Sequence, residues 1–273
     1  RPGGVKPSGT AELRFRPIYR GDDAVGGVDP GALRVTYRRM TKTALIVAHG
    51  QPSDPRPAGA ALEGLAARVQ ALLPGWEVLA ATLAEDGAMA KAVAGRMGGV
   101  VFPMFMAGGW FTKVQIPKKL AEAGAMGWTV LEPFGCDPLV HDLCVTLARE
   151  AGEGRVILAA HGSFKSAAPS DIAFHVAGRI ATEAGAAVEA GFIDQDPQLS
   201  SLTGGAGVCL PFFAAEGGHV SDHIPAALAE AGFTGTILPP VGLDERVPGI
   251  IAAAILRGVP VCAGACRWAR GQA

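Results

Sequence analysis

The stretch LPFFAAEGGHVSDHIPAAL, residues 210–228, decides the fold, because the chain carries a second copy of it. Residues 102–120 read FPMFMAGGWFTKVQIPKKL and share the apolar run, the Gly-Gly pair and the Ile-Pro pair in the same order. We align His219 with Trp110, and His223 with Val114 or Gln115. Since the histidines are present in only one copy, the two copies are expected to differ in their chemistry.

The duplication extends over most of the chain. ALIVAH at 44–49 corresponds to RVILAAH at 155–161, and EVLAATLA at 77–84 corresponds to AVEAGFID at 187–194. A period above 100 residues is too long for a solenoid and indicates two copies of a whole domain. We predict one repeat over 40–153 with a degenerate site and a second over 154–273 that holds the metal site and ends in a C-terminal tail.

The first 39 residues differ from the rest in composition. They contain eight Lys or Arg residues against four acids, and no period of 2 or 3.6 runs through them for long. Met40 stands directly ahead of the first convincing strand. We therefore interpret 1–39 as a basic N-terminal extension, either an over-long reading frame or a poorly ordered appendage.

Strand and helix patterns alternate in each repeat. Short continuous apolar runs such as 44–49 are typical of strands buried on both faces, and residues 59–73 place their leucines on one helical face. Asp86 and Asp137 are predicted helix N-caps. The order predicts an α/β fold of two similar flavodoxin-like domains, each a four-stranded parallel sheet with helices on both faces and strands one and three adjacent.

Composition excludes several kinds of partner. The net charge of −1 favours neither nucleic acid nor an anionic membrane surface as a partner. Five cysteines without framework spacing indicate a reduced cytoplasm, and the Cys262 and Cys266 pair alone is too few ligands for a soft-metal site. The apolar stretch 247–265 is interrupted by Arg257 and Pro260, so we predict a buried helix followed by a strand or tail instead of a membrane span.

The candidate site follows from the strand order. His49 and His161 each end the first strand of their half, and His219 follows the third strand of the second half. Ligands bind at the carboxyl ends of parallel strands, so His161 and His219 are expected to converge. Their imidazole centres should lie about 5–8 Å apart if both bind one metal ion. His223 is four residues beyond His219, on the same face of a helix.

These residue types favour metal chemistry over the alternatives. Imidazoles with a carboxylate such as Glu216 suit a divalent transition metal, and two or three ligands make an open site. The histidine phosphatases also contain His-Gly, but that chemistry requires a basic neighbour, and Ala160 precedes His161 here. Ser163 as a nucleophile is disfavoured because no nucleophile elbow surrounds it.

The paired elements LIVAHG and ILAAHGS, together with LPFFAAEGGHVSDHIP, resemble the sirohydrochlorin chelatase family of the CbiX kind, kin to the anaerobic cobaltochelatases and class II ferrochelatases. The resemblance covers about 44–257. It implies insertion of Co²⁺ or Fe²⁺ into sirohydrochlorin or a related carboxylated tetrapyrrole, in cobalamin or siroheme biosynthesis, without ATP and without an organic cofactor. By motif, the family's two metal-binding histidines fall on His161 and His219.

The other candidate residues complete this hypothesis. Glu216 or His223 would accept the pyrrole protons, and Trp110 would stack on the flat macrocycle. Substrate contacts are assigned to Ser163, Lys165, Trp110, His49 and His223. We expect a monomer, because both halves lie in one chain. Two other functions stay open: a metallochaperone without catalysis, and a tetrapyrrole-binding pseudo-enzyme.

Overall fold

The computed structural model describes residues 42–270, so the predicted extension over 1–39 lies outside the described residues. Two four-stranded sheets are present there, with strand orders β2-β1-β3-β4 and β6-β5-β7-β8. Every pairing within them is parallel, and strands one and three of each half are neighbours, as predicted. The bounds of the repeats stay a prediction.

The elements of the first half are β1 (Lys42–Ala48), α1 (Pro55–Leu72), β2 (Trp76–Thr82), α2 (Ala88–Val93), β3 (Gly99–Pro103), the π turn η1 (Phe111–Gln115), α3 (Ile116–Glu122), β4 (Trp128–Val130), the 3₁₀ turn η2 (Phe134–Cys136) and α4 (Pro138–Ala151). Those of the second half are β5 (Arg155–Ala160), α5 (Ala168–Ala184), β6 (Ala187–Phe192), η3 (Leu199–Ser201), β7 (Val208–Pro211), the π turn η4 (His219–His223), α6 (Ile224–Glu230), β8 (Thr236–Ile237), η5 (Val241–Leu243) and α7 (Val247–Arg257).

The first strand of each half is buried on both faces. Ala44 and Ile46 of β1 belong to one hydrophobic cluster, and Leu45 and Val47 belong to a second cluster on the opposite face. Successive side chains of a strand point to opposite faces of a sheet, so an uninterrupted apolar run supplies two cores at once. This is why a continuous run, and not an alternating one, marks β1.

Two of the predicted helix starts can be compared with the structure. Asp137 is the N-cap of α4, where its Oδ1 accepts a hydrogen bond from the Leu139 N–H at 2.9 Å. The prediction for Asp86 is wrong, because α2 begins at Ala88 with Gly87 as N-cap in the left-handed conformation. A glycine with φ of +75° turns the chain into α2 there, and no side-chain cap is used.

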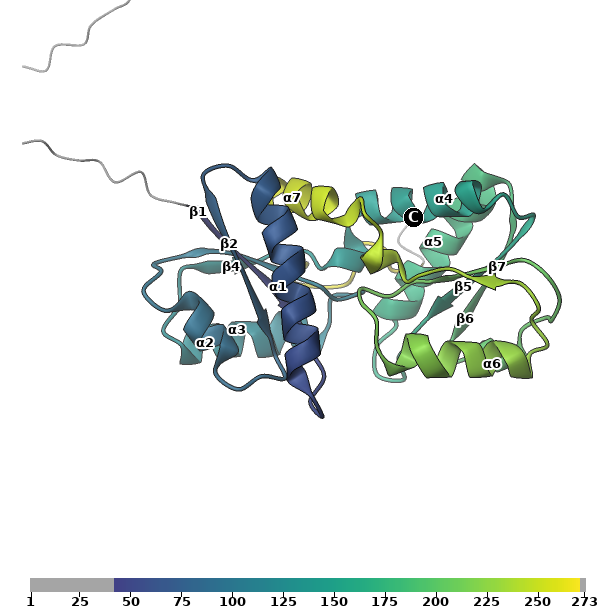
Figure 1. Cartoon of the computed structure of the whole chain (residues 1–273), viewed down its shortest axis with the longest axis horizontal. Helices are drawn as coiled ribbons and strands as arrows, with labels where there is room; N and C mark the ends of the chain where they lie inside the picture. The colour runs from purple at the N-terminus through teal and green to yellow at the C-terminus, as the bar shows by residue number, and fades with distance from the viewer. Residues whose placement is uncertain (1–41, 271–273) are drawn as a thin grey trace, which may run out of the picture. The chain divides into compact units, whose positions relative to one another are not determined.

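The last helix of each half packs on the other half (Figure 1). Helix α4 contacts α5 and β7 of the second half, while α7 contacts α1 and β3 of the first. One hydrophobic cluster therefore includes Val140 of α4, Ile172 of α5 and Ile251 of α7. This exchange holds the two sheets in one compact unit, and the linear repeat pattern does not reveal it.

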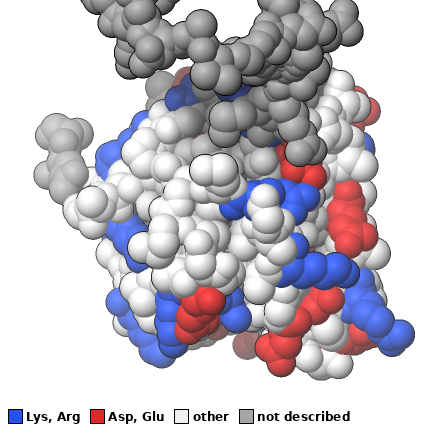
Figure 2. Space-filling view, turned by 90° about the vertical axis from the view of Figure 1, so that its left-hand side faces the viewer, with Lys and Arg blue, Asp and Glu red and all other residues white. Residues whose placement is uncertain are grey.

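Charges of both signs are interspersed on the face of the first half that Figure 2 shows. This mixed pattern agrees with the net charge of −1. Within residues 42–270 no helix combines the length and the apolar character needed to cross a membrane. The cytoplasmic location stays a prediction.

Candidate functional site

His161 lies directly after β5, at the carboxyl edge of the second sheet. Gly162 follows in the left-handed conformation with φ of +75°, and a Cβ there would come within 2.6 Å of the Gln195 side chain. The Gln195 Oε1 accepts a hydrogen bond from the Ser163 N–H at 2.7 Å. The turn after His161 therefore requires glycine for its backbone conformation and for the close approach of Gln195.

His219 and His223 are the first and last residues of the π turn η4. The wide turn closes with a hydrogen bond from the Ile224 N–H to the His219 carbonyl oxygen. Pro225 follows, and because proline has no N–H it cannot make the next helical hydrogen bond to this turn. Single π turns occur frequently at functional sites, and this one brings two histidine side chains together.

The three histidines form a contiguous cluster. The ring centres of His161 and His219 are 4.6 Å apart, and those of His219 and His223 are 4.9 Å apart. The first distance is slightly shorter than the range of about 5–8 Å that we expect for two imidazoles around one metal ion. His161 and His219 are therefore adjacent in the structure, as the strand order predicts.

Hydrogen bonds determine which ring nitrogens remain available. The Nδ1 atoms of His219 and His223 are 2.9 Å apart, so two neutral rings must share one proton there. His161 Nδ1 lies 3.0 Å from the Gly162 carbonyl oxygen and 3.4 Å from Asp194 Oδ2, both of which accept an N–H. The Nε2 atom of His161 then keeps a lone pair that suits a metal ion, and Nε2 of His219 keeps one when its own Nδ1–H is the donor to His223.

The electrostatic surroundings favour the neutral form of His219. Burial lowers the pKa of its imidazole, and the neighbouring His161 and His223 lower that pKa further, while Asp194 opposes the change. A neutral imidazole is the form that binds metals. The side chain of His161 is 43% exposed, so a ligand can reach the pair from solvent.

Within residues 42–270 no three His, Cys, Asp or Glu side chains surround a common metal position. A closed structural site needs four ligands, whereas two neutral histidines leave most coordination positions open. The arrangement thus suits a metal ion that is held briefly and passed to another ligand.

The remaining predicted residues of the second half lie in loops beside this cluster. Ser163 and Lys165 follow His161, and the Ser163 hydroxyl oxygen accepts a hydrogen bond from the Lys165 N–H at 3.1 Å. Glu216 is exposed in the loop between β7 and η4. Their predicted roles stay predictions.

The alignment of Trp110 with His219 is wrong. The π turn η1 begins at Phe111 and η4 begins at His219, so Phe111 is the equivalent residue and Gln115 is the equivalent of His223. His49 meets Phe111 edge-to-face with ring centres 4.8 Å apart, as His161 meets His219. The Gly-Gly pairs before the two turns are offset by one residue relative to the Pro and Ile-Pro positions, which misled the alignment. Trp110 itself is 58% exposed.

Sequence reasoning did not select Asp194. It follows β6, and its N–H donates to the His161 carbonyl oxygen at 3.0 Å, which places its carboxylate beside the imidazole. The sequence AVEAGFID at 187–194 contained this signal, because Asp194 is its last residue. An acid that follows a strand parallel to β5 and next to it lies at the same edge of the sheet as His161. The equivalent residue of the first half is Ala84, whose N–H donates to the His49 carbonyl oxygen at 2.9 Å.

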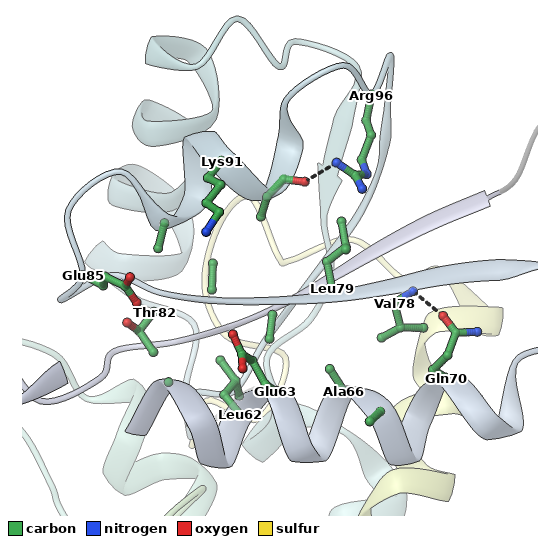
Figure 3. A pocket seen from close by; sticks show the side chains of 16 residues that line it. Leu62, Glu63, Ala66, Gln70, Val78, Leu79, Thr82, Glu85, Lys91 and Arg96 are labelled. Atoms are coloured by element: carbon green, nitrogen blue, oxygen red, sulfur yellow. Dashed lines mark hydrogen bonds between the residues drawn. The ribbon is translucent and has the colours of Figure 1, made fainter. Parts of the chain in front are cut away.

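A cavity of about 540 Å³ lies elsewhere, over the edge strand β2 between α1 and α2 (Figure 3). Two of its polar side chains bond to the backbone: Gln70 accepts from the Val78 N–H at 2.8 Å, and Arg96 donates to the Ala92 carbonyl oxygen at 3.0 Å. No histidine lines this cavity. This cavity therefore lacks the imidazole groups on which the hypothesis of a metal site rests.

Known proteins resemble this chain in sequence and in fold. The sequence profile of the CbiX family matches residues 155–257. A solved structure described as CbiX, the terminal enzyme for biosynthesis of siroheme in denitrifying bacteria, is 43% identical over 79% of this chain and 99% of its own, with a TM-score of 0.74. This chain belongs to the CbiX family. It is therefore a member of the chelatases, the enzymes that insert a metal into a tetrapyrrole.

More distant chelatases share the fold of this CbiX family member. SirB from Bacillus subtilis with Fe³⁺ is 16% identical over 81% of this chain and 96% of its own, with a TM-score of 0.66. SirB from Bacillus subtilis subspecies spizizenii in complex with cobalt gives 16% identity over the same shares and a TM-score of 0.63. A search of curated proteins returned no match. The CbiX profile covers the half that contains His161 and His219.

Proposed function

We propose that the second half binds Co²⁺ or Fe²⁺ between His161 and His219 and inserts it into sirohydrochlorin or a related carboxylated tetrapyrrole. The observation that carries this proposal is the pair of imidazoles 4.6 Å apart at one sheet edge. Cobalamin or siroheme biosynthesis would supply such a substrate, and the reaction requires no ATP. The metal is a substrate of the reaction.

The proposed mechanism starts with two Nε2 lone pairs. His161 is oriented by Asp194 and Gly162 through its Nδ1, and His219 is oriented by His223 through its own Nδ1. A carboxylate that accepts from the remote nitrogen of a metal-binding histidine fixes the ring and raises its basicity. The substrate's pyrrole nitrogens then displace the histidines one after another, and the open coordination positions admit them.

Proton transfer must accompany insertion. Two pyrrole N–H protons leave the macrocycle for each M²⁺ that enters, so a base is needed near the metal. His223 is exposed and in contact with His219, and Glu216 lies in the exposed loop before His219. We assign proton acceptance to these two residues, which are near enough in the chain to act on the same face of a bound macrocycle.

Substrate binding would use the surrounding loops. The exposed Lys165 suits a macrocycle carboxylate, and Ser163 shapes the turn that presents it. From the first half we assign His49 and the exposed Trp110 to the opposite wall, where the indole offers a flat apolar surface. One chain supplies both halves, so we propose a monomer.

The test is a spectral assay in anaerobic buffer. Sirohydrochlorin is mixed with Co²⁺ or Fe²⁺ and the protein, and its absorbance spectrum is followed against a protein-free control. We expect His161→Ala to lower the insertion rate about 100-fold or more, since one of two ligands is lost, equivalent to about 2.7 kcal/mol. The matched variant His49→Ala should lower the rate by a smaller factor, because its partner ring is Phe111 and its assigned role is a substrate contact.

The same assay distinguishes the alternatives. A metallochaperone would bind the metal in titration calorimetry but leave the tetrapyrrole spectrum unchanged. A pseudo-enzyme would shift the tetrapyrrole spectrum without forming the metallated product. Either result, or equal losses from His161→Ala and His49→Ala, would overturn the proposed function.

A further inference from the structure

Three of the five cysteines meet at one place in the first half, far from the histidine cluster in sequence. Cys136 of η2 and the tail residues Cys262 and Cys266 line a cavity of about 10 Å³ together with Glu132 and Lys113. A space of this size holds about one water molecule, so the side chains around it are close. This cluster has no part in the proposed metal insertion.

The tail that carries Cys262 and Cys266 crosses the first half as a strap, residues 259–270. It begins as an antiparallel addition to β4, where the Glu132 N–H donates to Val259 at 2.9 Å and the Val261 N–H donates to Val130 at 3.0 Å. Farther along, the Lys113 ammonium donates to the Gly264 carbonyl oxygen at 2.6 Å. The strap is therefore tied to the end of β4 and to the π turn η1.

The last part of the strap lies between the two halves. Both Arg267 and the Trp268 indole donate to the Cys136 carbonyl oxygen, at 3.1 and 2.9 Å. The Trp268 ring stacks on His175 of α5 with centres 4.4 Å apart. Arg270 pairs with Asp171 of α5 at 2.9 Å. The strap thus joins the start of α4 to α5, on the side where the halves exchange their last helices.

Within this cluster Cys136 and Cys266 line the same small cavity. The Cys136 thiol donates a hydrogen bond to the Cys266 sulfur, which lowers the pKa of Cys266 to about 6. Burial and the same hydrogen bond raise the pKa of the Cys136 thiol. Cys266 is half-buried and Cys136 is buried, so a small reagent meets Cys266 first.

The groups around Cys266 shift the pKa of its thiol in both directions. The Trp268 backbone N–H and Lys113 favour its thiolate, while Glu132 disfavours it. Glu132 is itself paired with Arg267 at 2.6 Å and accepts a contact from the Cys262 thiol at 3.8 Å. Cys262 is thereby directed to a carboxylate, which leaves Cys136 and Cys266 as the other two thiols that line this cavity.

We propose that Cys136 and Cys266 form a reversible disulfide that fastens the C-terminal strap to the start of α4. The oxidant is a small-molecule disulfide, RSSR. The Cys266 thiolate attacks one sulfur of RSSR, forms a mixed disulfide and releases one RS⁻, which takes up a proton. Cys136 then loses its proton and attacks the Cys266 sulfur, which releases the second RSH. Two thiols are oxidised and one RSSR is reduced to two RSH.

A bound metal ion is the competing interpretation of three clustered cysteines. It is disfavoured because no three His, Cys, Asp or Glu side chains in the described part of the chain surround one metal position. Lys113 and Arg267 also place two positive charges at this cluster, which disfavour a metal cation there.

The test uses the full chain and glutathione disulfide. After incubation at pH 7.5, non-reducing peptide mass mapping should show the Cys136 and Cys266 peptides joined, with intact mass lower by two hydrogens and restored by dithiothreitol. Cys266→Ser should abolish the link. Because Cys266 is only half-buried, we expect this variant to keep its fold. The matched variant Cys262→Ser, from the same strap, should still form it.

Alkylation kinetics provide a second measurement that does not depend on the disulfide. In the reduced protein, iodoacetamide at pH 7 should label Cys266 on the order of tenfold faster than a free thiol of ordinary pKa, because most of Cys266 is already thiolate. The melting temperature of the oxidised form should rise by several degrees, since the bond closes a long loop.

Three outcomes would overturn the proposal. They are a disulfide through Cys262, a glutathione adduct that stays on Cys266 without passing to Cys136, and a metal ion that copurifies with the protein and is lost in Cys266→Ser. None of these outcomes bears on metal insertion at His161 and His219, because the strap test uses no tetrapyrrole.

Discussion

Each half presents the same Ala-His-Gly at the end of its first strand, but the ring that the histidine meets differs. His49 contacts Phe111 at 4.8 Å with the rings at 90°, and His161 contacts His219 at 4.6 Å with the rings at 76°. The edge-to-face contact is thus common to both halves. In the first half the contact joins a histidine to a phenylalanine and can only contribute packing. In the second half it joins two histidines, which can both bind a metal ion.

The difference extends to the neighbours of that ring pair. Where the second half has Asp194 beside His161, the first half has Ala84, and where it has His223 the first half has Gln115. The proposed ligand, orienting carboxylate and adjacent base are all replaced in the first half, while the backbone hydrogen bonds are kept. One half therefore serves as a natural reference for the other.

The largest effect is expected from His219→Phe, which gives the second half the ring of the first. Packing should persist, since Phe111 already occupies the same place beside His49. Metal affinity in titration calorimetry should fall about 100-fold or more, equivalent to about 2.7 kcal/mol, because one of two ligands is gone. Phe111→Leu is the control in the other half and should leave that affinity unchanged. Unaltered Co²⁺ binding by His219→Phe would remove His219 from the site.

Asp194→Ala should have a smaller effect, because Asp194 acts through His161. Loss of a carboxylate that orients a metal-binding histidine typically costs about tenfold in affinity or activity. The insertion rate should fall by about that factor, with Asp222→Ala, an exposed acid of the same π turn as His219, as the control. A drop in insertion rate as large as that expected for His161→Ala would mean that Asp194 is itself a metal ligand.

The α/β fold and the strand order could be predicted from the sequence, because a short continuous apolar run such as 44–49 is typical of a parallel strand buried on both faces. His161 and His219 could also be predicted to meet, since strand order alone brings the ends of strands one and three together. The one-residue error at Trp110 arose because we aligned the two Gly-Gly pairs. The π turns show that the correct alignment pairs Phe111 with His219. The exchange of α4 and α7 was not accessible, because an amphipathic helix does not specify which apolar face covers it.

The smallest effect should come from restoring the first half. The triple variant Ala84→Asp, Phe111→His and Gln115→His gives His49 the same neighbours that His161 has. It is best made together with His161→Ala and His219→Ala, so that any metal bound belongs to the rebuilt site. We expect Co²⁺ binding at one equivalent in titration calorimetry, with affinity about tenfold or more below that of the native site, since the loops around His49 are not adapted to it. The same background with Ala84→Asp alone should bind no Co²⁺, because a carboxylate at this position orients His49 and leaves that histidine as a single ligand. If the rebuilt half binds no metal, backbone equivalence is insufficient, and the loop after His161 that Gln195 supports through Ser163 must also be part of the site.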